Sequence, residues 1–512
     1  MRSIRVLKNV VTNYARFLLG GLTGFVLTPV MVHAMGDGDY GLWVAVFSLT
    51  GYFGLFDQGL RPSLVRYVSR DHARGDHDGL NRTINTAIAL FATIGLATVA
   101  ATAFVASNFT RWFRVEPTQV AEVGGVVWIA GLSVAVGFPL GVFGAVLSGL
   151  QRYDIGNWIG IAVTVARAGI FVAVLRLGGG LVELAWASFV MNLVGHAVTW
   201  AWVHRLLPRL AYGARWVSRE HLGLIGAYGS IAFLGALASS IAFQTDALVI
   251  TAFIGAASVT PFAIAAGLVE TVRSLVHSAT YVLSPTASEL ETRGETGTLH
   301  AMLVAGAKYS VLVSWPVLWG LLVFGEAFLV TWVGEPYRTA FPVLAILTAP
   351  TFVALPQATA AALLFGVSRH KGVVALSLLN AALNLGLSVW WARPFGVAGV
   401  AMGTAVPLAL VSGVAMMVYA CRALGMPLAA YLRDGMLRPG LVSLAFLVPA
   451  LVVRRLWDPA GWLPLGVACA GCWAVFAACA WALGVDAGER ARWGRMFAGL
   501  TGRHAPAGAE GA

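Results

Sequence analysis

The sequence predicts an all-α, polytopic integral membrane protein with about 14 transmembrane helices, in two six-helix lobes plus a terminal helix pair. Of the 512 residues, 58% are hydrophobic and only 11% are charged. Soluble domains are roughly 25% charged, so this composition leaves too little polar surface to cover a globule in water. In addition, apolar segments of about 20 residues, the length that crosses a bilayer, recur along the whole chain.

The predicted spans are joined by mostly short connections. They fall near residues 10–34, 41–68, 82–106, 121–149, 155–177, 181–204, 222–254, 260–288, 303–330, 341–367, 372–392, 396–420, 438–456 and 462–484. With the amino terminus in the cytoplasm, about 23 Lys and Arg residues lie in cytoplasmic loops or helix ends and about 7 on the opposite side. We therefore expect both termini in the cytoplasm. The net charge of +11 is scattered over these loops, which argues against nucleic acid as a partner.

Two longer cytoplasmic stretches divide the chain. Residues 205–221 and 422–440 are amphipathic and basic, which predicts connectors that lie as helices at the membrane interface. The resulting parts are an N-terminal six-helix lobe (1–204), a C-terminal six-helix lobe (222–421), two terminal transmembrane helices (441–484) and a cytoplasmic tail (485–512). The two lobes are predicted to be structural repeats, because a helix in each carries an acid, an arginine and a proline: Asp57, Arg61, Pro62; Glu270, Arg273, Pro285.

Motifs for cofactor chemistry are weak in this chain. Cys469 and Cys472 have C-x-x-C spacing but lie in an apolar helix without basic or histidine neighbours, so neither redox chemistry nor a metal site is expected. No Walker-type phosphate-binding motif is present to power transport with ATP. We expect no cofactor, and an ion gradient or the membrane potential as the driving force.

A family resemblance rests on residues 36–70. The turn GDGDYGLW and the helix end GLFDQGLRPSLVRYVSR resemble bacterial polysaccharide exporters of the Wzx (O-antigen flippase) type, in the multidrug/oligosaccharidyl-lipid/polysaccharide exporter superfamily. The resemblance implies a MATE/MurJ-like flippase fold in the bacterial inner membrane. It also implies transport of undecaprenyl-pyrophosphate-linked oligosaccharide among membrane lipids, with a polysaccharide polymerase and a chain-length regulator as partners.

Charged residues inside the predicted spans must face protein or a water-filled cavity, because each costs at least about 2.5 kcal/mol at the bilayer centre. Asp57 and Arg61 lie one helical turn apart, which predicts an ion pair at a cytoplasmic gate. Glu270 and Arg273 have similar spacing, so Glu270 is assigned to the same class. Asp246 and Glu270 are also the candidate ion-coupling residues.

Three arginines inside the predicted spans are the candidate substrate ligands, and Arg167 is the strongest of them. Arg167 has no acid close in sequence, and helix rise places it on the order of 18 Å into its span. Arg167, Arg273 and Arg16 are therefore predicted to hold the pyrophosphate, since a guanidinium can bind phosphate through two parallel hydrogen bonds.

Other polar and small residues predict helix packing. Asn380 with Asn384, and Asn192 with His196, are expected to hydrogen-bond across helices. Gly156 and Gly160 form a small-x-x-x-small pair, which predicts close contact with another helix.

Two other functions stay open at this stage. A cation-coupled multidrug antiporter of the same fold predicts a mainly acidic cavity. A membrane-embedded glycosyltransferase or polymerase needs catalytic acids in a large external loop, and the longest external loop contains only Glu116. We therefore expect a transporter rather than an enzyme.

Overall fold

The computed structural model describes residues 2–280, 283–485 and 488–490, without the side chains of some residues among them, such as 56–59 and 226–236. Every secondary-structure element in this part of the chain is helical, which confirms the all-α prediction. The first elements are α1 (Arg2–Phe53), α2 (Leu55–Arg74), α3 (His77–Trp112), α4 (Val120–Gly149), α5 (Tyr153–Arg176), α6 (Leu181–Leu206), η1 (Ala214–Trp216) and α7 (Arg219–Phe253).

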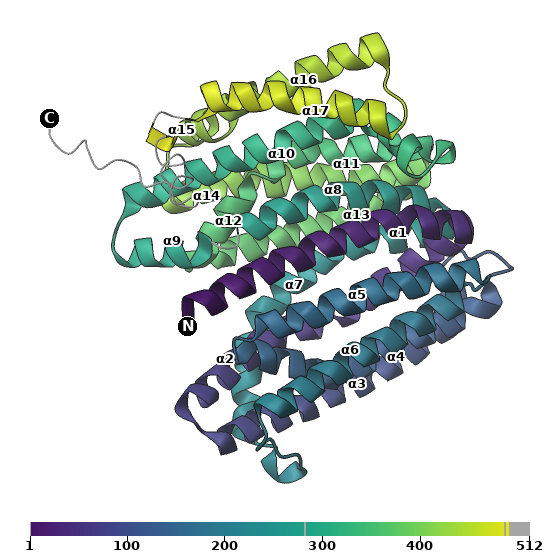
Figure 1. Cartoon of the computed structure of the whole chain (residues 1–512), viewed down its shortest axis with the longest axis vertical. Helices are drawn as coiled ribbons and strands as arrows, with labels where there is room; N and C mark the ends of the chain where they lie inside the picture. The colour runs from purple at the N-terminus through teal and green to yellow at the C-terminus, as the bar shows by residue number, and fades with distance from the viewer. Residues whose placement is uncertain (1, 281–282, 486–487, 491–512) are drawn as a thin grey trace. The chain divides into compact units, whose positions relative to one another are not determined.

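The remaining elements include several short or π-helical pieces (Figure 1). They are η2 (Ala256–Ser258), α8 (Val259–Thr280), α9 (Leu283–Thr292), α10 (Thr296–Trp332), η3 (Glu335–Ala340), α11 (Phe341–Ala354), α12 (Gln357–Gly366), α13 (His370–Pro407), η4 (Leu408–Ala415), α14 (Met416–Leu424), α15 (Leu428–Ala430), η5 (Tyr431–Leu437), α16 (Arg438–Trp457), α17 (Trp462–Cys479) and η6 (Ala480–Gly484).

Eleven of the described helical stretches are long and apolar enough to cross a membrane, so the predicted number of about 14 spans is not confirmed. Two of these stretches, Val11–Phe53 with 43 residues and His370–Leu424 with 55, each contain an internal bend, at Gly36 and at Gly396. The predicted span at 41–68 is divided between α1 and α2 by a turn at Gly54, a residue that itself keeps a right-handed helical conformation.

Two glycines bend the longest helices. Gly36 in α1 has φ 76° and Gly396 in α13 has φ 58°. Both angles lie in the left-handed region, which costs a residue with a Cβ about 1 kcal/mol or more. Each helix is therefore divided into two arms, and the bend in α13 positions a polar cluster described below.

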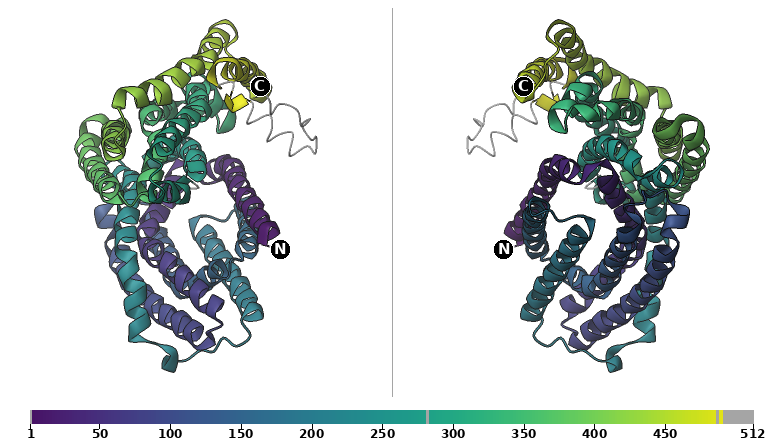
Figure 2. Two further views of the ribbon diagram at one scale, coloured as in Figure 1. Left: turned by 90° about the vertical axis from the view of Figure 1, so that its left-hand side faces the viewer. Right: turned by 90° about the vertical axis from the view of Figure 1, so that its right-hand side faces the viewer.

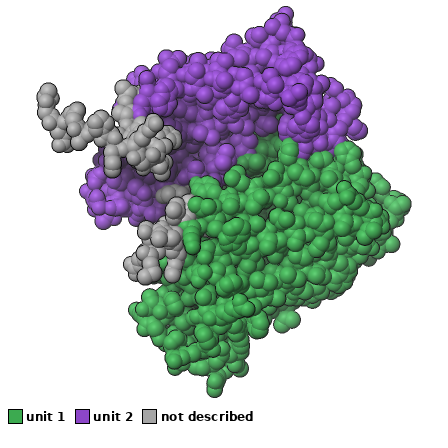
Figure 3. Space-filling model, viewed as in Figure 1, with its two compact units in different colours: residues 1–271, 339–347, 374–411 green, residues 272–338, 348–373, 412–512 purple. Residues whose placement is uncertain are grey.

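The chain forms two compact units, shown in separate colours in Figure 3. Unit 1 comprises residues 1–271, 339–347 and 374–411, and unit 2 comprises residues 272–338, 348–373 and 412–512. These units are compact in space and do not follow the chain order of the predicted lobes. The division of the sequence into lobes at 1–204 and 222–421 stays a prediction.

Unit 1 is built around neighbouring helices from the first part of the chain. α4 packs between α3 and α6, and α1 packs along α5, as Figures 1 and 2 show. Leu64, Phe91 and Val146 are buried in one hydrophobic cluster that joins α2, α3 and α4. Because lipid is as apolar as these side chains, close packing rather than removal from water holds such helices together.

The predicted connector helix at 205–221 is wrong for most of its length. Only η1 is helical between the end of α6 and the start of α7. Two buried asparagines of α3 bond the connector backbone instead: Asn81 Oδ1 accepts the Ala211 N–H at 3.0 Å, and Asn85 bonds the Ala211 carbonyl and the Gly213 N–H. These side chains form hydrogen bonds with backbone N–H and C=O groups that would otherwise bond to each other in a helix.

In unit 2 the terminal pair α16–α17 is attached along α10. Trp319 Nε1 donates to Ser443 Oγ at 3.2 Å, and Arg454 pairs with Glu326 at 2.7 Å. These contacts lie two helical turns apart in the second half of α10. The predicted connector at 422–440 is mostly helical, through α15, η5 and the start of α16.

Candidate functional site: an arginine-lined cavity and a buried carboxylate

Unit 1 contains a cavity of about 420 Å³ between α1, α2, α4, α5 and α6. We refer to it as the arginine cavity. Its polar lining residues are Arg16, Arg61, Ser148, Arg152, Tyr153, Asn157, Asn192, His196 and Thr199. No carboxylate is found among the described residues that line it. The sequence analysis assigned Arg16 and Arg61 to different roles, and the structure brings both to this one cavity.

Hydrogen bonds between α1 and the start of α5 position Arg16. Asn9 Oδ1 accepts the Asp154 N–H at 3.0 Å, and Asn157 Nδ2 donates to Thr12 Oγ1 at 3.2 Å. Arg16 follows Thr12 by one helical turn, so the same face of α1 that is bonded to α5 presents the guanidinium to the cavity.

Glycines provide the space in which the two guanidiniums lie. A Cβ at Gly144 of α4 would lie 2.7 Å from Arg61 Nη2, and a Cβ at Gly160 of α5 would lie 2.8 Å from Arg16 Cζ. Gly156 has no atom within 4 Å of an added Cβ and also lines the cavity. The predicted close contact with another helix is confirmed at Gly160, where the neighbour is the Arg16 side chain of α1, and it is not found at Gly156.

The cavity is lined by three guanidiniums. Arg152 is paired with Asp154 at 3.0 Å, which neutralises its charge. Arg16 and Arg61 supply the other two guanidiniums of the lining. The Asp57 side chain lies outside the described residues, so the predicted Asp57–Arg61 ion pair stays a prediction. A cavity with this lining favours an anionic group that accepts several hydrogen bonds.

The other predicted substrate ligands are placed elsewhere. Arg167 is half-buried on α5, one turn beyond the lining residue Val163, and no hydrogen bond or ion pair joins it to another described residue. Arg273 and Glu270 are three residues apart on α8, Arg273 half-buried and Glu270 exposed. Arg273 belongs to unit 2 and Arg167 to unit 1, and their joint role stays a prediction.

Asp246 of α7 lies in a second polar site in unit 1. It is buried, and both arms of α13 contact it: Thr404 Oγ1 donates to Oδ2 at 2.6 Å and Ser388 Oγ to Oδ1 at 3.5 Å. Both hydroxyls also reach the Val400 carbonyl, at 3.4 and 3.3 Å. The bend at Gly396 allows Ser388 and Thr404 to meet on one carboxylate.

This second site consists of oxygen atoms. Asn384 Nδ2 donates to Thr404 Oγ1 at 2.8 Å, while Asn384 Oδ1 is buried without a hydrogen-bond partner among the described residues. A carboxylate, two hydroxyls, a backbone carbonyl and an amide oxygen are the ligands preferred by hard cations. The buried carboxylate lacks an ion-pair partner among the described residues, so a bound cation or a proton would remove the cost of its charge. The role of Asp246 in ion coupling stays a prediction.

Residues 6–291 match the family described as polysaccharide biosynthesis protein. The chain belongs to that family. The matched region contains every residue of the arginine cavity and Asp246. Ser388 and Thr404, which contact Asp246, lie beyond it.

A relative extends the similarity of this family member to nearly its whole length. The uncharacterized membrane protein EpsK of Bacillus subtilis (strain 168) is 22% identical over 484 residues, which cover 92% of this chain and 94% of EpsK.

Solved structures confirm the predicted transporter fold. The lipid II flippase MurJ, in an inward closed conformation, aligns with a TM-score of 0.73 at 13% identity, over 92% of this chain and 97% of MurJ. A multidrug resistance MATE family transporter of the MOP superfamily, in its inward-facing conformation, aligns with a TM-score of 0.66 at 16% identity, over 82% of this chain and 95% of the transporter.

The sequence analysis did not identify several residues of the arginine cavity and of the Asp246 site in this family member. Arg152 and Asn157 were assigned no role, although Asn157 stands three residues before Gly160 on the cavity face of α5. Ser388 is one helical turn after the predicted polar residue Asn384, a spacing that could have indicated it. Thr404 could not be found this way, because only the bend at Gly396 brings it to Asp246. The predicted cross-helix bonding is confirmed for Asn192, which donates to Ser133 Oγ at 3.2 Å.

Proposed function

We propose that the protein is a flippase that moves undecaprenyl-pyrophosphate-linked oligosaccharide across the bacterial inner membrane by alternating access, for O-antigen or exopolysaccharide synthesis. The observation that supports this most directly is the arginine cavity, where Arg16 and Arg61 lie over glycines and no described lining residue is acidic. Membership of the polysaccharide biosynthesis protein family and the MurJ-like fold support the same proposal.

The lining suits the pyrophosphate end of such a substrate. Guanidiniums bind phosphate oxygens in pairs and keep their charge in a poorly solvated site. Asn157, Asn192 and Thr199 offer hydrogen bonds to a neighbouring sugar. A cavity of about 420 Å³ holds a small-molecule-sized group, so we expect it to bind the pyrophosphate and the sugar next to it, with the remaining glycan outside.

The driving force is assigned to the Asp246 site. A monovalent cation or a proton there would neutralise a carboxylate that two arms of α13 share. Binding and release of the ion would then change how strongly Asp246 holds the two arms of α13 in their bent arrangement. An ion gradient could in this way drive a movement of these arms. A polysaccharide polymerase and a chain-length regulator would act on the product at the periplasmic face.

The test is a gene deletion complemented with variants. Undecaprenyl-linked oligosaccharide should accumulate in the cytoplasmic leaflet of the deletion strain and surface polysaccharide should be lost. Arg16→Ala and Arg61→Ala should each restore transport about tenfold less well than the wild type, the effect of one charge-assisted hydrogen bond. Arg176→Ala is the matched control, because Arg176 is exposed at the far end of α5.

Two outcomes would contradict the proposal. An unchanged lipid pool together with new drug sensitivity would favour a cation-coupled multidrug antiporter of the same fold. Full transport by Arg16→Ala and Arg61→Ala at wild-type membrane levels would show that the arginine cavity does not hold the substrate.

A further inference from the structure

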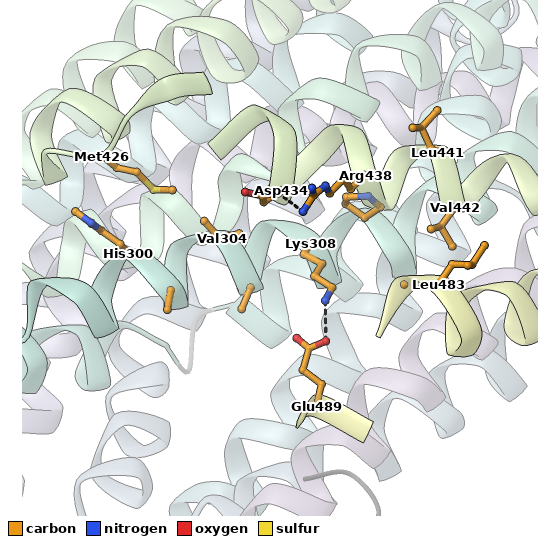
Figure 4. Close-up of a pocket in the computed structure, with 14 residues that line it drawn as sticks. His300, Val304, Lys308, Met426, Asp434, Arg438, Leu441, Val442, Leu483 and Glu489 are labelled. Atoms are coloured by element: carbon orange, nitrogen blue, oxygen red, sulfur yellow. Dashed lines mark hydrogen bonds and ion pairs between the residues drawn. The ribbon is translucent and has the colours of Figure 1, made fainter. Parts of the chain in front are cut away.

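Unit 2 contains a pocket of about 750 Å³ between α10, the start of α16 and η6, drawn in Figure 4. We refer to it as the α10–α16 pocket. It is separate from the arginine cavity, which unit 1 forms alone. It lies at the ends of α10 and α16 that are expected to face the cytoplasm from the distribution of basic residues.

One wall of the pocket is apolar. It consists of Leu441 and Val442 of α16 and Leu483 of η6, which Figure 4 shows together at one end. An apolar wall at the membrane boundary fits an acyl chain better than a soluble metabolite, because the chain need not leave the bilayer to reach it.

The opposite part of the pocket holds basic groups. Asp434 pairs with Arg438 at 2.8 Å and also, outside the pocket lining, with Arg433 at 2.9 Å, so Arg438 shares its carboxylate with a second guanidinium. Lys308 of α10 lies beside this group in the pocket (Figure 4). Basic pockets between helices on the cytoplasmic side are typical binding sites for anionic lipid headgroups.

Lys308 is held by a carboxylate from the end of the chain. Its ammonium is 2.7 Å from Glu489 Oε2, and the two side chains are only 14% and 12% exposed. Glu489 follows η6, and it is not part of α10 or α16. The carboxylate of Glu489 therefore occupies the position from which the phosphate of a ligand in the pocket would contact Lys308.

The two segments that border this anion position are π-helical. η5 carries Asp434, and η6 ends five residues before Glu489. Turns of π-helix are rare and are frequently found at functional sites. Their presence on two sides of one pocket argues for a role beyond packing.

We propose that the α10–α16 pocket binds an anionic membrane phospholipid. The phosphate contacts Lys308 and Arg438, an acyl chain lies along Leu441, Val442 and Leu483, and Glu489 occupies the phosphate position when lipid is absent. Lipid and Glu489 therefore compete for Lys308. This site does not depend on the proposed transport substrate, because it is formed by other residues in the other unit.

Lipid binding by the purified full-length protein tests the proposal. Native mass spectrometry in detergent would measure retained palmitoyl-oleoyl phosphatidylglycerol, with palmitoyl-oleoyl phosphatidylcholine as the comparison. Lys308→Ala should weaken retention of phosphatidylglycerol about tenfold, and Glu489→Gln should strengthen it, because the competing carboxylate is removed. A structural ion pair predicts the same direction of change for both variants, so opposite directions distinguish the two roles.

Further variants keep the test decisive. The double variant Lys308→Ala/Glu489→Gln leaves no unpaired charge and should bind as weakly as Lys308→Ala. Arg455→Ala, at the other end of α16, should bind like the wild type. The proposal is overturned if phosphatidylcholine is retained equally well, if inorganic phosphate alone displaces the lipid, or if Glu489→Gln does not strengthen retention.

Discussion

At the scale of single residues, the arginines of this protein differ in what surrounds them. Arg152 has a carboxylate partner, Arg16 lies over a glycine, and Arg167 has no hydrogen bond or ion pair with any other described residue. A guanidinium within a membrane span is costly unless protein, water or ligand compensates its charge. The environment of each arginine, and not its presence in the sequence, indicates which of them can bind an anion.

Arg167 provides one prediction. If it contacts the pyrophosphate during transport, activity should fall in the order wild type, Arg167→Lys, Arg167→Ala, because Lys keeps the charge but loses the paired hydrogen bonds. We expect about a tenfold loss for Arg167→Ala. Transport activity is measured as the amount of surface polysaccharide that each variant restores in the deletion strain, with the variants compared at equal protein levels in the membrane. Full restoration by Arg167→Ala would assign the residue a structural role, and Arg176→Ala on the same helix is the control.

Asp246 provides a second prediction. Asp246→Asn keeps the shape of the side chain and removes its charge, so transport should lose its response to the ion gradient while the protein still folds. Thermal unfolding of the purified protein in sodium chloride and in choline chloride would show whether the ion is sodium. The wild type should be stabilised by sodium, and Asp246→Asn should not. Transport by Asp246→Asn at the wild-type rate would contradict ion coupling at this residue.

At the scale of elements, bends and small residues decide what the helices can do. The bend at Gly396 brings Ser388 and Thr404 to one carboxylate, and the glycines of α4 and α5 leave room for guanidiniums from α1 and α2. A straight α13 would separate Ser388 from Thr404 and so remove the Asp246 site. Bulkier residues at the glycines of α4 and α5 would fill the arginine cavity. Neither change would alter a charged residue.

Gly160→Ala tests this directly. The added methyl group would lie 2.8 Å from Arg16 Cζ, so the guanidinium must move out of its position over α5. We expect transport to fall several-fold with little change in the amount of folded protein, since the site is an open cavity and not a packed core. Gly156→Ala is a matched control one turn earlier on α5, where an added Cβ meets no atom within 4 Å. Equal losses in both variants would contradict the role assigned to the space at Gly160.

At the scale of the whole molecule, the orientation in the membrane is still a prediction. Helix α6 has 26 residues, which is on the order of 39 Å of helix and enough to cross a bilayer. Gly179 lies just before α6, and Gly213 lies in the connector after it.

Reporter fusions at Gly179 and Gly213 should therefore give opposite signals, periplasmic and cytoplasmic. This follows from the concentration of Lys and Arg on the side of the connector. Alkaline phosphatase and green fluorescent protein fusions measure the two compartments. Matching signals would contradict both the crossing by α6 and the predicted orientation.

The sequence by itself determined the class of fold and the placement of charge. Low charge content and repeated apolar segments require a helical membrane protein, because an unpaired backbone group in lipid is too costly for any open structure. The same reasoning singled out Arg16, Arg61 and Asp246, since a charge within an apolar span is rare and needs a reason. The side-chain surroundings of these residues could not be predicted in this way.

Only the tertiary structure decided what these charges contact. Thr12 and Asn157 are 145 residues apart, and Asp246 and Thr404 are 158 apart, so no local spacing predicts either contact. The course of the connector at 205–221 was also decided by tertiary contacts, namely asparagine side chains that bond a distant backbone. Helix formation follows from local composition, whereas a binding site depends on which helix faces meet, and that is settled by packing between distant segments.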